Sequence, residues 1–339
     1  VSTSLSHRST TPSLIAIITT GIAVGIAAAH CYTLHTGVLL PVAWLAAALV
    51  VSLPLCLLRR PHMGIVMAAT LVGGIIDTMQ WQHIRSATIP TGEAIYQVVI
   101  DSEPRHHERS TTMRATILQH EAPALCTQLT VLRDSTIRRG HHLLIRGSLQ
   151  PIRPVIRPYY HHDTWLWHQG VVCRAFAPHH RVLPHPQPTP TLRQRLLSLL
   201  RSSALSDNGE AVTEAMLLGS KTRLDASVRA AYSDAGGSHL LALSGLHLSI
   251  LTAVLFLLFG PHLHLHLLRL VVILPLVWFY VYLADAPPSL VRAATMLSVW
   301  LAADAVGRHT EGRDTLFFTI LVMLLVRPFW LFDTGFQLS

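Results

Sequence analysis

The chain has 339 residues, of which 50% are hydrophobic and only 13% are charged, and its mean hydropathy is +0.42. A soluble domain usually carries about a quarter of charged residues, so this composition excludes an ordinary soluble protein and indicates a membrane protein. The net charge is +8 and Lys221 is the only lysine; the guanidinium groups that carry this charge suit phosphate contact but are equally typical of a GC-rich genome.

Apolar stretches without acidic or basic residues predict helices that cross, or nearly cross, a hydrocarbon core of about 30 Å. There are seven of them: 13–29, 37–58, 61–76, 240–259, 270–284, 293–303 and 315–326. Because two more stretches follow the first at once, we expect the first to be a retained helix rather than a cleaved signal peptide.

Arginines in the short loops predict the orientation of these helices, because cytoplasmic loops keep positive charge. A start inside the cell and seven crossings place one set inside: Arg8, Arg59, Arg60, Arg269, Arg308 and Arg313. Arg292 and Arg327 fall outside and are exceptions. The same count places residues 77–239 on the extracytoplasmic face.

Short alternating runs between the third and fourth apolar stretches predict β-strands at 94–100, 111–118, 128–133, 142–149 and 171–176. Five such strands suit a small OB-type barrel. The predicted fold is therefore an α-helical polytopic membrane protein with an inserted small all-β (OB-like) periplasmic domain. The expected divisions are about three N-terminal helices over 1–76, the β domain over 77–187, a linker and amphipathic helix over 188–238, and a second helical bundle over 239–339.

The β domain is basic, since residues 80–187 hold twelve arginines against seven acidic residues. A basic barrel can follow the backbone of a polyanion while aromatic side chains stack on bases. The candidates for such contact are Arg153, Arg157, Tyr160 and Trp165. For an isolated domain we favour the alternative that the aromatics, with Tyr159 and Trp167, complete the barrel's own core.

Cys126 and Cys173 both lie in the β domain, and an oxidising compartment would allow a disulfide between them. Cys31 and Cys56 end apolar stretches and are expected to be plain hydrophobic residues. The spacing of cysteine and histidine suggests no metal site, and we expect no cofactor.

The segment that follows the β domain carries a motif that misleads. "LLGSKT" at 217–222 has Ser220 where a phosphate-binding loop needs glycine before its lysine, so no ATPase is expected in this chain. Residues 191–203 place leucines at helical spacing among arginines, which predicts a basic amphipathic helix that lies on the membrane interface or packs under the barrel.

Polar side chains within the later apolar sequence form the main candidate site. Ionisable groups in membrane segments usually face a bundle interior or an aqueous cavity, because contact with lipid is costly. Arg292 and Asp304 are twelve residues apart, a little over three helical turns, so they share roughly one face without pairing directly. The candidates for lining a polar path or shaping the bundle are His239, Ser244, Gly245, His247, Ser289, Arg292 and Asp304.

Ser244 and His247 also allow a second interpretation. Three residues apart, they share a helix face, so the histidine could act as base for a serine nucleophile in an intramembrane hydrolase. A hydrolase would also need an oxyanion pocket and an orienting carboxylate, and no G-x-S-x-G elbow is present. We therefore predict no catalytic residue and keep the hydrolase as the alternative.

Ordered motifs in the second half resemble those of the ComEC family of competence membrane channels. "AGGSHLLALSGLHLSIL" at 235–251 is similar to the family's A-G-x-x-H-L-L-A-x-S-G-L-H-x-x-x-L, "PPSLVRAATM" to its S-x-x-R-A-x-x-M, and "RPFWLFDTGFQLS" to its ending G-F-Q-L-S. "LLGSKTRLDASVRAAYSDAG" resembles the approach to the first motif, and "YYHHDTWLWHQGV" loosely resembles a barrel motif in which His161 replaces an acid.

The resemblance implies a protein of the bacterial inner membrane that imports single-stranded DNA during natural transformation. Its implied partners are single-stranded DNA, membrane lipid, a periplasmic DNA receptor, a cytoplasmic ATP-driven translocase and, as a homo-oligomer, further copies of itself. A transporter of another polyanion is a further alternative. The "YLADAPPS" loop departs from the family by Asp285 and Ala286 where a glycine is usual, and the chain stops at "GFQLS" where the family's bundle continues, so we expect a fragment.

Overall fold

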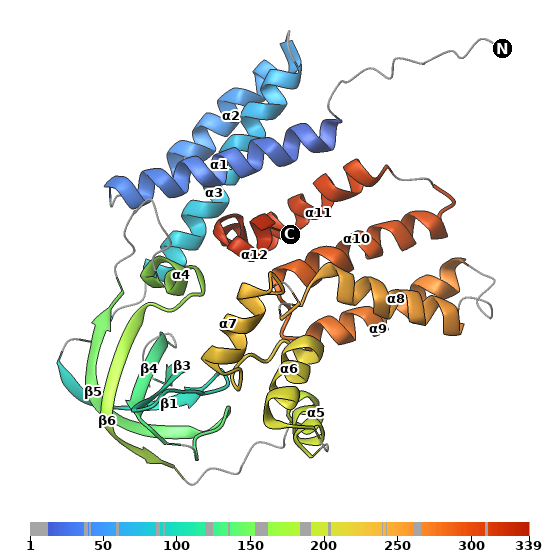
Figure 1. The fold of residues 1–339 in the computed structure, drawn as a ribbon. Helices are drawn as coiled ribbons and strands as arrows, with labels where there is room; N and C mark the ends of the chain where they lie inside the picture. The colour runs from blue at the N-terminus through green and yellow to red at the C-terminus, as the bar shows by residue number, and fades with distance from the viewer. Residues whose placement is uncertain are drawn as a thin grey trace. The chain divides into compact units, whose positions relative to one another are not determined.

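The structure is a computed structural model in which two compact units are described separately (Figure 1). One unit comprises residues 1–79 and 295–331, and the other comprises 80–294 and 332–339. The described residues are 13–36, 40, 42–58, 61–85, 89–90, 92–118, 125–134, 136–152, 162–183, 191–202, 205–238, 240–241, 243–259, 266–308 and 311–338.

Each of the seven apolar stretches of the sequence contains a helix. The corresponding helices are α1 (Leu14–Thr36), α2 (Val42–Leu58), α3 (Pro61–Arg85), α8 (Gly245–Phe259), α9 (His266–Leu283), α10 (Pro288–Ala305) and α11 (Gly312–Val326). Among the described residues, two segments are long and apolar enough to cross a membrane, Leu14–Thr36 and Met63–Gln82, whereas Gly245–Phe259 and Arg269–Leu283 are apolar but shorter. A multi-pass topology therefore stays a prediction.

Close packing between α1 and α3 organises the first unit. Gly21 and Gly25 form a G-x-x-x-G pattern on α1, a spacing that lets helix backbones approach closely. A Cβ atom added at Gly25 would overlap the backbone carbonyl of Thr70, and one added at Gly73 would overlap that of Ile22. The absence of side chains at these positions is thus what permits the crossing.

A closed five-stranded barrel forms the β part of the second unit. Its strands are β1 (Glu93–Ile100), β3 (Ser110–Leu118), β4 (Leu125–Leu132), β5 (His142–Pro151) and β6 (Cys173–Val182). The short strand β2 (Arg105–His106) pairs antiparallel with β3. The order is β1-β5-β6-β4-β3, and β1 closes the barrel by pairing with β3. Neighbours are antiparallel except β4 and β6, which are parallel.

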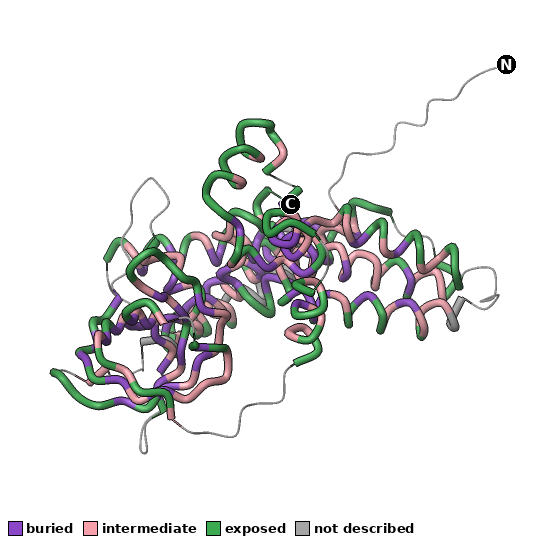
Figure 2. The backbone as a smooth tube through the Cα atoms, turned by 60° about the horizontal axis from the view of Figure 1, so that its bottom comes forward, coloured by how far each residue is buried: buried purple, intermediate pink, exposed green. Residues whose placement is uncertain are grey.

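Alternation of side chains explains why these segments form a barrel. Along β3 and β4 every second residue is buried, because successive side chains of a strand point to opposite faces. Figure 2 colours the whole backbone by this burial. Val98, Leu129 and Ile145 are completely or almost completely buried in the resulting core. The predicted five-stranded barrel is confirmed.

Shorter helices accompany the barrel in the second unit: α4 (His162–His168) lies between β5 and β6, and α5 (Leu192–Arg201), α6 (Asp207–Leu218) and α7 (Ala226–Asp234) follow β6. After α11 the chain forms η2 (Pro328–Phe332) and α12 (Thr334–Leu338). Helix α5 is the predicted amphipathic helix, and a capping box of Thr191 and Gln194 starts it. Its Leu197 packs with Leu218 of α6 and Leu283 of α9, so its apolar face contacts other helices.

Candidate functional site

The motif S-G-L-H starts α8, and its serine and histidine are in contact. The Nδ1 atom of His247 lies 3.2 Å from the backbone nitrogen of Ser244, which donates to it, and 3.1 Å from Ser244 Oγ. An acceptor three residues into a helix that binds the N–H of the capping residue resembles one half of a capping box. The pair therefore satisfies the start of α8, with the imidazole in the place usually held by Glu or Gln.

The start of α10 packs against the start of α8. Ser289 Oγ donates a 2.7 Å hydrogen bond to the carbonyl oxygen of Leu243, directly before Ser244. A Cβ atom added at Gly245 would lie 3.4 Å from the Cβ of Ala293. The S-G-L-H and S-x-x-R-A motifs, about fifty residues apart in the chain, thus meet at one place, which brings the predicted Ser244, Gly245, His247 and Ser289 together.

Arg292 lies in this second motif and has an unsatisfied donor. Its Nε atom is buried without a hydrogen-bond partner, although the side chain as a whole is partly exposed. An orphaned buried donor costs roughly 1–3 kcal/mol, so Arg292 is the residue here with most to gain from an anionic ligand. Helix α10 is continuous to Ala305, which places Asp304 twelve residues further and about 18 Å along the axis.

One further motif segment, Leu217–Leu218–Gly219, packs against the same place. Gly219 ends α6 with a φ of 70°, and a Cβ atom there would lie 2.8 Å from Leu243 Cδ1. Tyr280 of α9 donates its hydroxyl hydrogen to the carbonyl of Leu217 over 3.1 Å. The LLG segment is thereby fixed against both α9 and the residue preceding Ser244.

The turn after α9 explains the departure from the family's glycine. The backbone nitrogens of Asp285 and Ala286 donate to the carbonyls of Tyr282 and Val281, the hydrogen bonds of a Schellman motif. Asp285 and Ala286 have φ values of 67° and 49°, in the left-handed region that glycine enters at least cost. The turn forms with the usual hydrogen bonds, at the expense of backbone strain.

Of the remaining candidate residues from the sequence analysis, only some lie within the described residues. His239, Arg153, Arg157 and Tyr160 lie outside the described residues. Trp165 is half-buried on α4 and stacks on His162, with ring centroids 5.5 Å apart. Its neighbour Trp167 is buried against Trp81, with centroids 4.0 Å apart, so this aromatic packs inside the protein.

The predicted disulfide is not formed in this structure, where Cys126 and Cys173 are free thiols. The register of β4 and β6 pairs Thr127 with Cys173, one position after Cys126, so the two cysteines point to opposite faces of the sheet. Burial raises the pKa of Cys126 to about 11 and raises that of Cys173 as well.

Among the described residues no group of His, Cys, Asp and Glu side chains is arranged to hold a metal ion.

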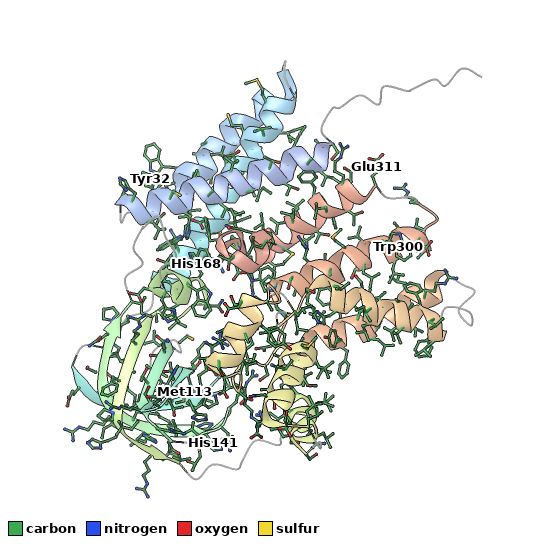
Figure 3. All side chains as sticks on the ribbon, viewed as in Figure 1. Tyr32, Met113, His141, His168, Trp300 and Glu311 are labelled. Atoms are coloured by element: carbon green, nitrogen blue, oxygen red, sulfur yellow. The ribbon has the colours of Figure 1, made fainter. Side chains whose placement is uncertain are left out.

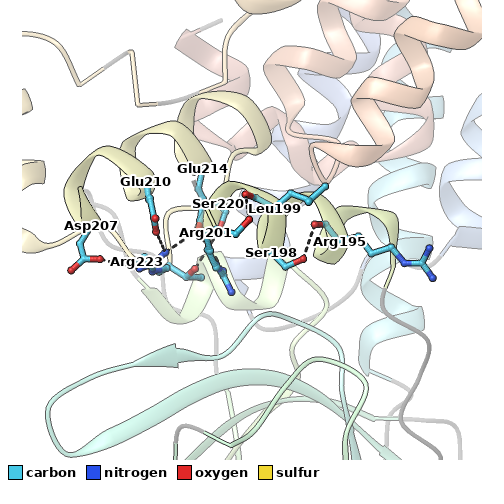
Figure 4. A network of polar contacts seen from close by, with 11 residues as sticks. Arg195, Ser198, Leu199, Arg201, Asp207, Glu210, Glu214, Ser220 and Arg223 are labelled. Carbon is cyan, nitrogen blue, oxygen red and sulfur yellow. Dashed lines mark hydrogen bonds and ion pairs between the residues drawn. The ribbon is translucent and has the colours of Figure 1, made fainter. Parts of the chain in front are cut away.

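An ion-pair network that the sequence analysis missed joins α5, α6 and the loop after α6 (Figure 4). The buried Glu214 accepts from Arg201 Nε over 2.9 Å and from Arg223 over 3.2 Å, and Arg223 also binds Glu210 over 3.0 Å. These contacts raise the pKa of Arg223, the hydrogen bond with Glu210 most of all. The available signal was Glu210 and Glu214 at a spacing of four residues, on one helix face.

A second missed pair lies between α1 and α3 in the first unit. His30 Nδ1 and Asp77 Oδ1 are 3.2 Å apart and both side chains are buried, while Asp77 Oδ2 and Thr33 Oγ1 are buried without hydrogen-bond partners. Paired ionisable groups inside apolar helices are rare and commonly functional. The signal in the sequence was a lone aspartate directly after the apolar stretch 61–76, which α3 extends to Arg85.

Comparisons with known proteins agree with this convergence of motifs. Residues 216–339 match the model of the Competence protein family. The chain is 36% identical over 152 residues to ComE operon protein 3 of Bacillus subtilis (strain 168), which covers 44% of this chain and 19% of that protein.

An uncharacterized protein of Aquifex aeolicus (strain VF5) is 29% identical over 149 residues, 44% of this chain and 35% of that protein. The chain thus spans well under half the length of either relative, and no solved structure matches it. Residues 216–339 therefore match the competence protein family, and this match confirms the resemblance to the ComEC family over that part of the chain.

Proposed function

We propose that this chain is part of an inner-membrane channel that imports single-stranded DNA during natural transformation. The observation that carries the proposal is the family match over 216–339 together with the meeting of its motifs at the starts of α8 and α10. A polyanion that crosses a bilayer needs a polar path, because unpaired phosphates are costly to desolvate. Arg292, with its unsatisfied Nε, is our candidate for a phosphate contact in that path.

Ser244, Gly245, His247 and Ser289 take a shaping role in this proposal. The contact of Ser244 with His247 completes the start of α8, and the contacts of Ser289 and Gly245 join it to the start of α10, which orients α10 and with it Arg292. His239 and Asp304 remain candidates for lining the path.

The barrel is proposed to be an OB-like periplasmic domain that contacts the incoming strand. Its five strands, its closure through β1 and its basic composition support this assignment. Proposed partners are a periplasmic DNA receptor and a cytoplasmic ATP-driven translocase, with membrane lipid around the helices. Transport of another polyanion is the alternative within the same class.

The experiment uses the full-length gene in its own transformable host. Labelled duplex DNA is followed into the periplasm and then the cytoplasm of a deletion strain carrying wild-type, Arg292→Gln or Arg292→Lys genes. The proposal expects DNA to stop in a nuclease-protected periplasmic pool in the deletion and Arg292→Gln strains, with partial rescue by lysine. Unchanged cytoplasmic entry in the deletion strain would exclude DNA import by this protein.

The hydrolase alternative rests on the 3.1 Å contact between Ser244 Oγ and His247 Nδ1. It is weakened because the same Nδ1 accepts the Ser244 backbone N–H, and none of the described carboxylates hydrogen-bonds His247. A Ser244→Ala variant separates the two hypotheses. Import at near wild-type level supports the shaping role, whereas loss of import with α8 intact favours chemistry at Ser244.

A further inference from the structure

One end of the barrel collects arginines from segments far apart in the sequence. The 101–109 connection, the 133–141 loop and the end of β6 meet there, since Arg133 N–H donates to the Arg109 carbonyl and His180 binds Asp134 over 2.9 Å. His141 marks this end in Figure 3. We name it the basic end, and its arginines are Arg105, Arg109, Arg133, Arg138, Arg139 and Arg181.

Two of the four acids near the basic end, Asp101 and Asp134, are engaged with other groups, and Glu103 and Glu108 are the other two. Asp101 accepts from the Thr116 hydroxyl, and Asp134 accepts from His180 and Thr136. Within the described residues, Arg105, Arg109, Arg133, Arg139 and Arg181 form no ion pair with any of them. The arginines on the barrel wall behave differently, since Arg146 pairs with Glu93 and Arg174 with Asp163.

These five guanidinium groups, which form no ion pair within the described residues, create a positive potential that attracts anions. His106 lies within this positive potential. Partial burial lowers the pKa of His106, and the charges of Arg138 and Arg133 lower it further. A bound phosphate would relieve this repulsion.

The positive region continues beyond the barrel to the loop after α6. Partial burial of its amine lowers the pKa of Lys221, and the charges of Arg229 on α7 and Arg105 on the barrel lower it further, so the three cations are close enough to repel one another. The loop is fixed on both sides of Lys221, because Ser220 is buried and Arg223 is tied to Glu210 and Glu214 (Figure 4). Lys221 itself is exposed.

We propose that the basic end and Lys221 form one binding track for the phosphodiester backbone of a single nucleic-acid strand. The inference rests on the proposed function and adds where the strand lies and that Lys221 carries it from the barrel to the family-matched region. Guanidinium groups suit phosphate by their forked donors.

Phe176 favours a nucleic-acid strand over lipid headgroups. It is 58% exposed on β6, five residues before Arg181, which is roughly 17 Å along a strand. An exposed ring at that distance offers a stacking face to a base of the strand whose phosphates lie at the basic end.

The test measures binding of a labelled oligothymidylate to the full chain in nanodiscs at several salt concentrations. A triple variant that combines Arg105→Gln, Arg139→Gln and Lys221→Gln is compared with a control variant, Arg146→Gln, in which the substituted arginine lies on the barrel wall. Each phosphate contact to a single strand contributes about 0.7 to the slope of log affinity against log salt. The track predicts that the triple variant lowers this slope by about 2, while the control leaves it unchanged and Phe176→Ala weakens binding without changing the slope.

A slope unchanged in the triple variant, or lowered equally in the control, overturns the track. If the triple variant no longer binds phosphatidylglycerol vesicles but still binds the oligonucleotide, the basic end is assigned to lipid instead. Melting curves of each variant exclude misfolding as the cause. If the deletion strain confirms DNA import but the wild-type chain binds no oligonucleotide, the track fails and the proposed function stands.

Lys221 allows a second readout that does not depend on substitution. Pyridoxal phosphate carries an aldehyde and an anion, and borohydride reduction fixes it to an amine. Peptide mass spectrometry is expected to show labelling at Lys221 and protection by the oligonucleotide. Equal labelling with and without oligonucleotide contradicts a contact at this residue.

Discussion

At the residue scale, backbone strain is concentrated in the turn between α9 and α10. Ala286 has a φ of 49° and no polar side chain to compensate, and a non-glycine residue in this region costs about 1 kcal/mol or more. We expect Ala286→Gly to raise the free energy of unfolding by roughly 0.5–1 kcal/mol, measured by thermal melting. The control is Ala231→Gly inside α7, which should lower stability by a similar amount; the same sign for both would contradict the assignment.

The histidine of the S-G-L-H motif shows how a residue can mislead at this scale. In the sequence, His247 looks like a base for Ser244, whereas its Nδ1 accepts the backbone N–H at the start of α8. The sequence distance of three residues is the same for both roles. Only the position at which the helix begins distinguishes them, and helix starts are the part of an element that residue patterns locate least well.

At the element scale, the contact of α1 with α3 depends on glycine. We expect Gly25→Ala to force the helices apart, because its Cβ would overlap the carbonyl of Thr70, and to lower stability by about 1–3 kcal/mol. Gly74→Ala is the matched control on the same helix pair, since its Cβ would lie 3.8 Å from its nearest neighbours. Denaturant unfolding in detergent measures both, and equal effects would show that the crossing tolerates separation.

Asp134 ties the 133–141 loop to β6 and predicts a pH dependence. Partial burial acts to raise the pKa of Asp134, but hydrogen bonds from His180 and Thr136 outweigh it and lower the pKa from 3.8 to about 2. A carboxylate with a lowered pKa stabilises the fold above its unfolded value. We therefore expect stability to fall between about pH 4 and pH 2, and to fall less in an Asp134→Asn variant; parallel profiles would contradict this.

The sequence predicts those elements that are determined by residues close together in the chain. Hydrophobic runs locate the seven apolar helices, and alternation locates the five strands of the barrel, because both patterns depend on neighbours in the chain. The contacts of Ser289 with Leu243 and of Gly245 with Ala293 join motifs about fifty residues apart. The family resemblance marks those residues without saying that they meet, and the parallel pairing of β4 with β6 has no local signal at all.

At the scale of the whole molecule, the predicted topology places the barrel outside the cytoplasm. A Ser148→Cys variant presents an exposed thiol on β5, in a background with Cys31→Ala and Cys56→Ala. Cys126 and Cys173 react slowly because burial raises the pKa of each thiol. We expect a membrane-impermeant maleimide to label intact spheroplasts as fully as permeabilised ones; labelling only after permeabilisation would place the barrel inside.

Closure of the barrel sets an order of events during synthesis. β1 needs both β3 and β5 as neighbours, and β4 and β5 each need β6, so no subset of the first strands completes the cylinder. The ribosome must therefore release the chain as far as Val182 before any β-barrel exists, with Leu129 and Ile145 still exposed to water until then. Because of this strand order, the cell must protect the nascent segment from aggregation until β6 has been synthesised.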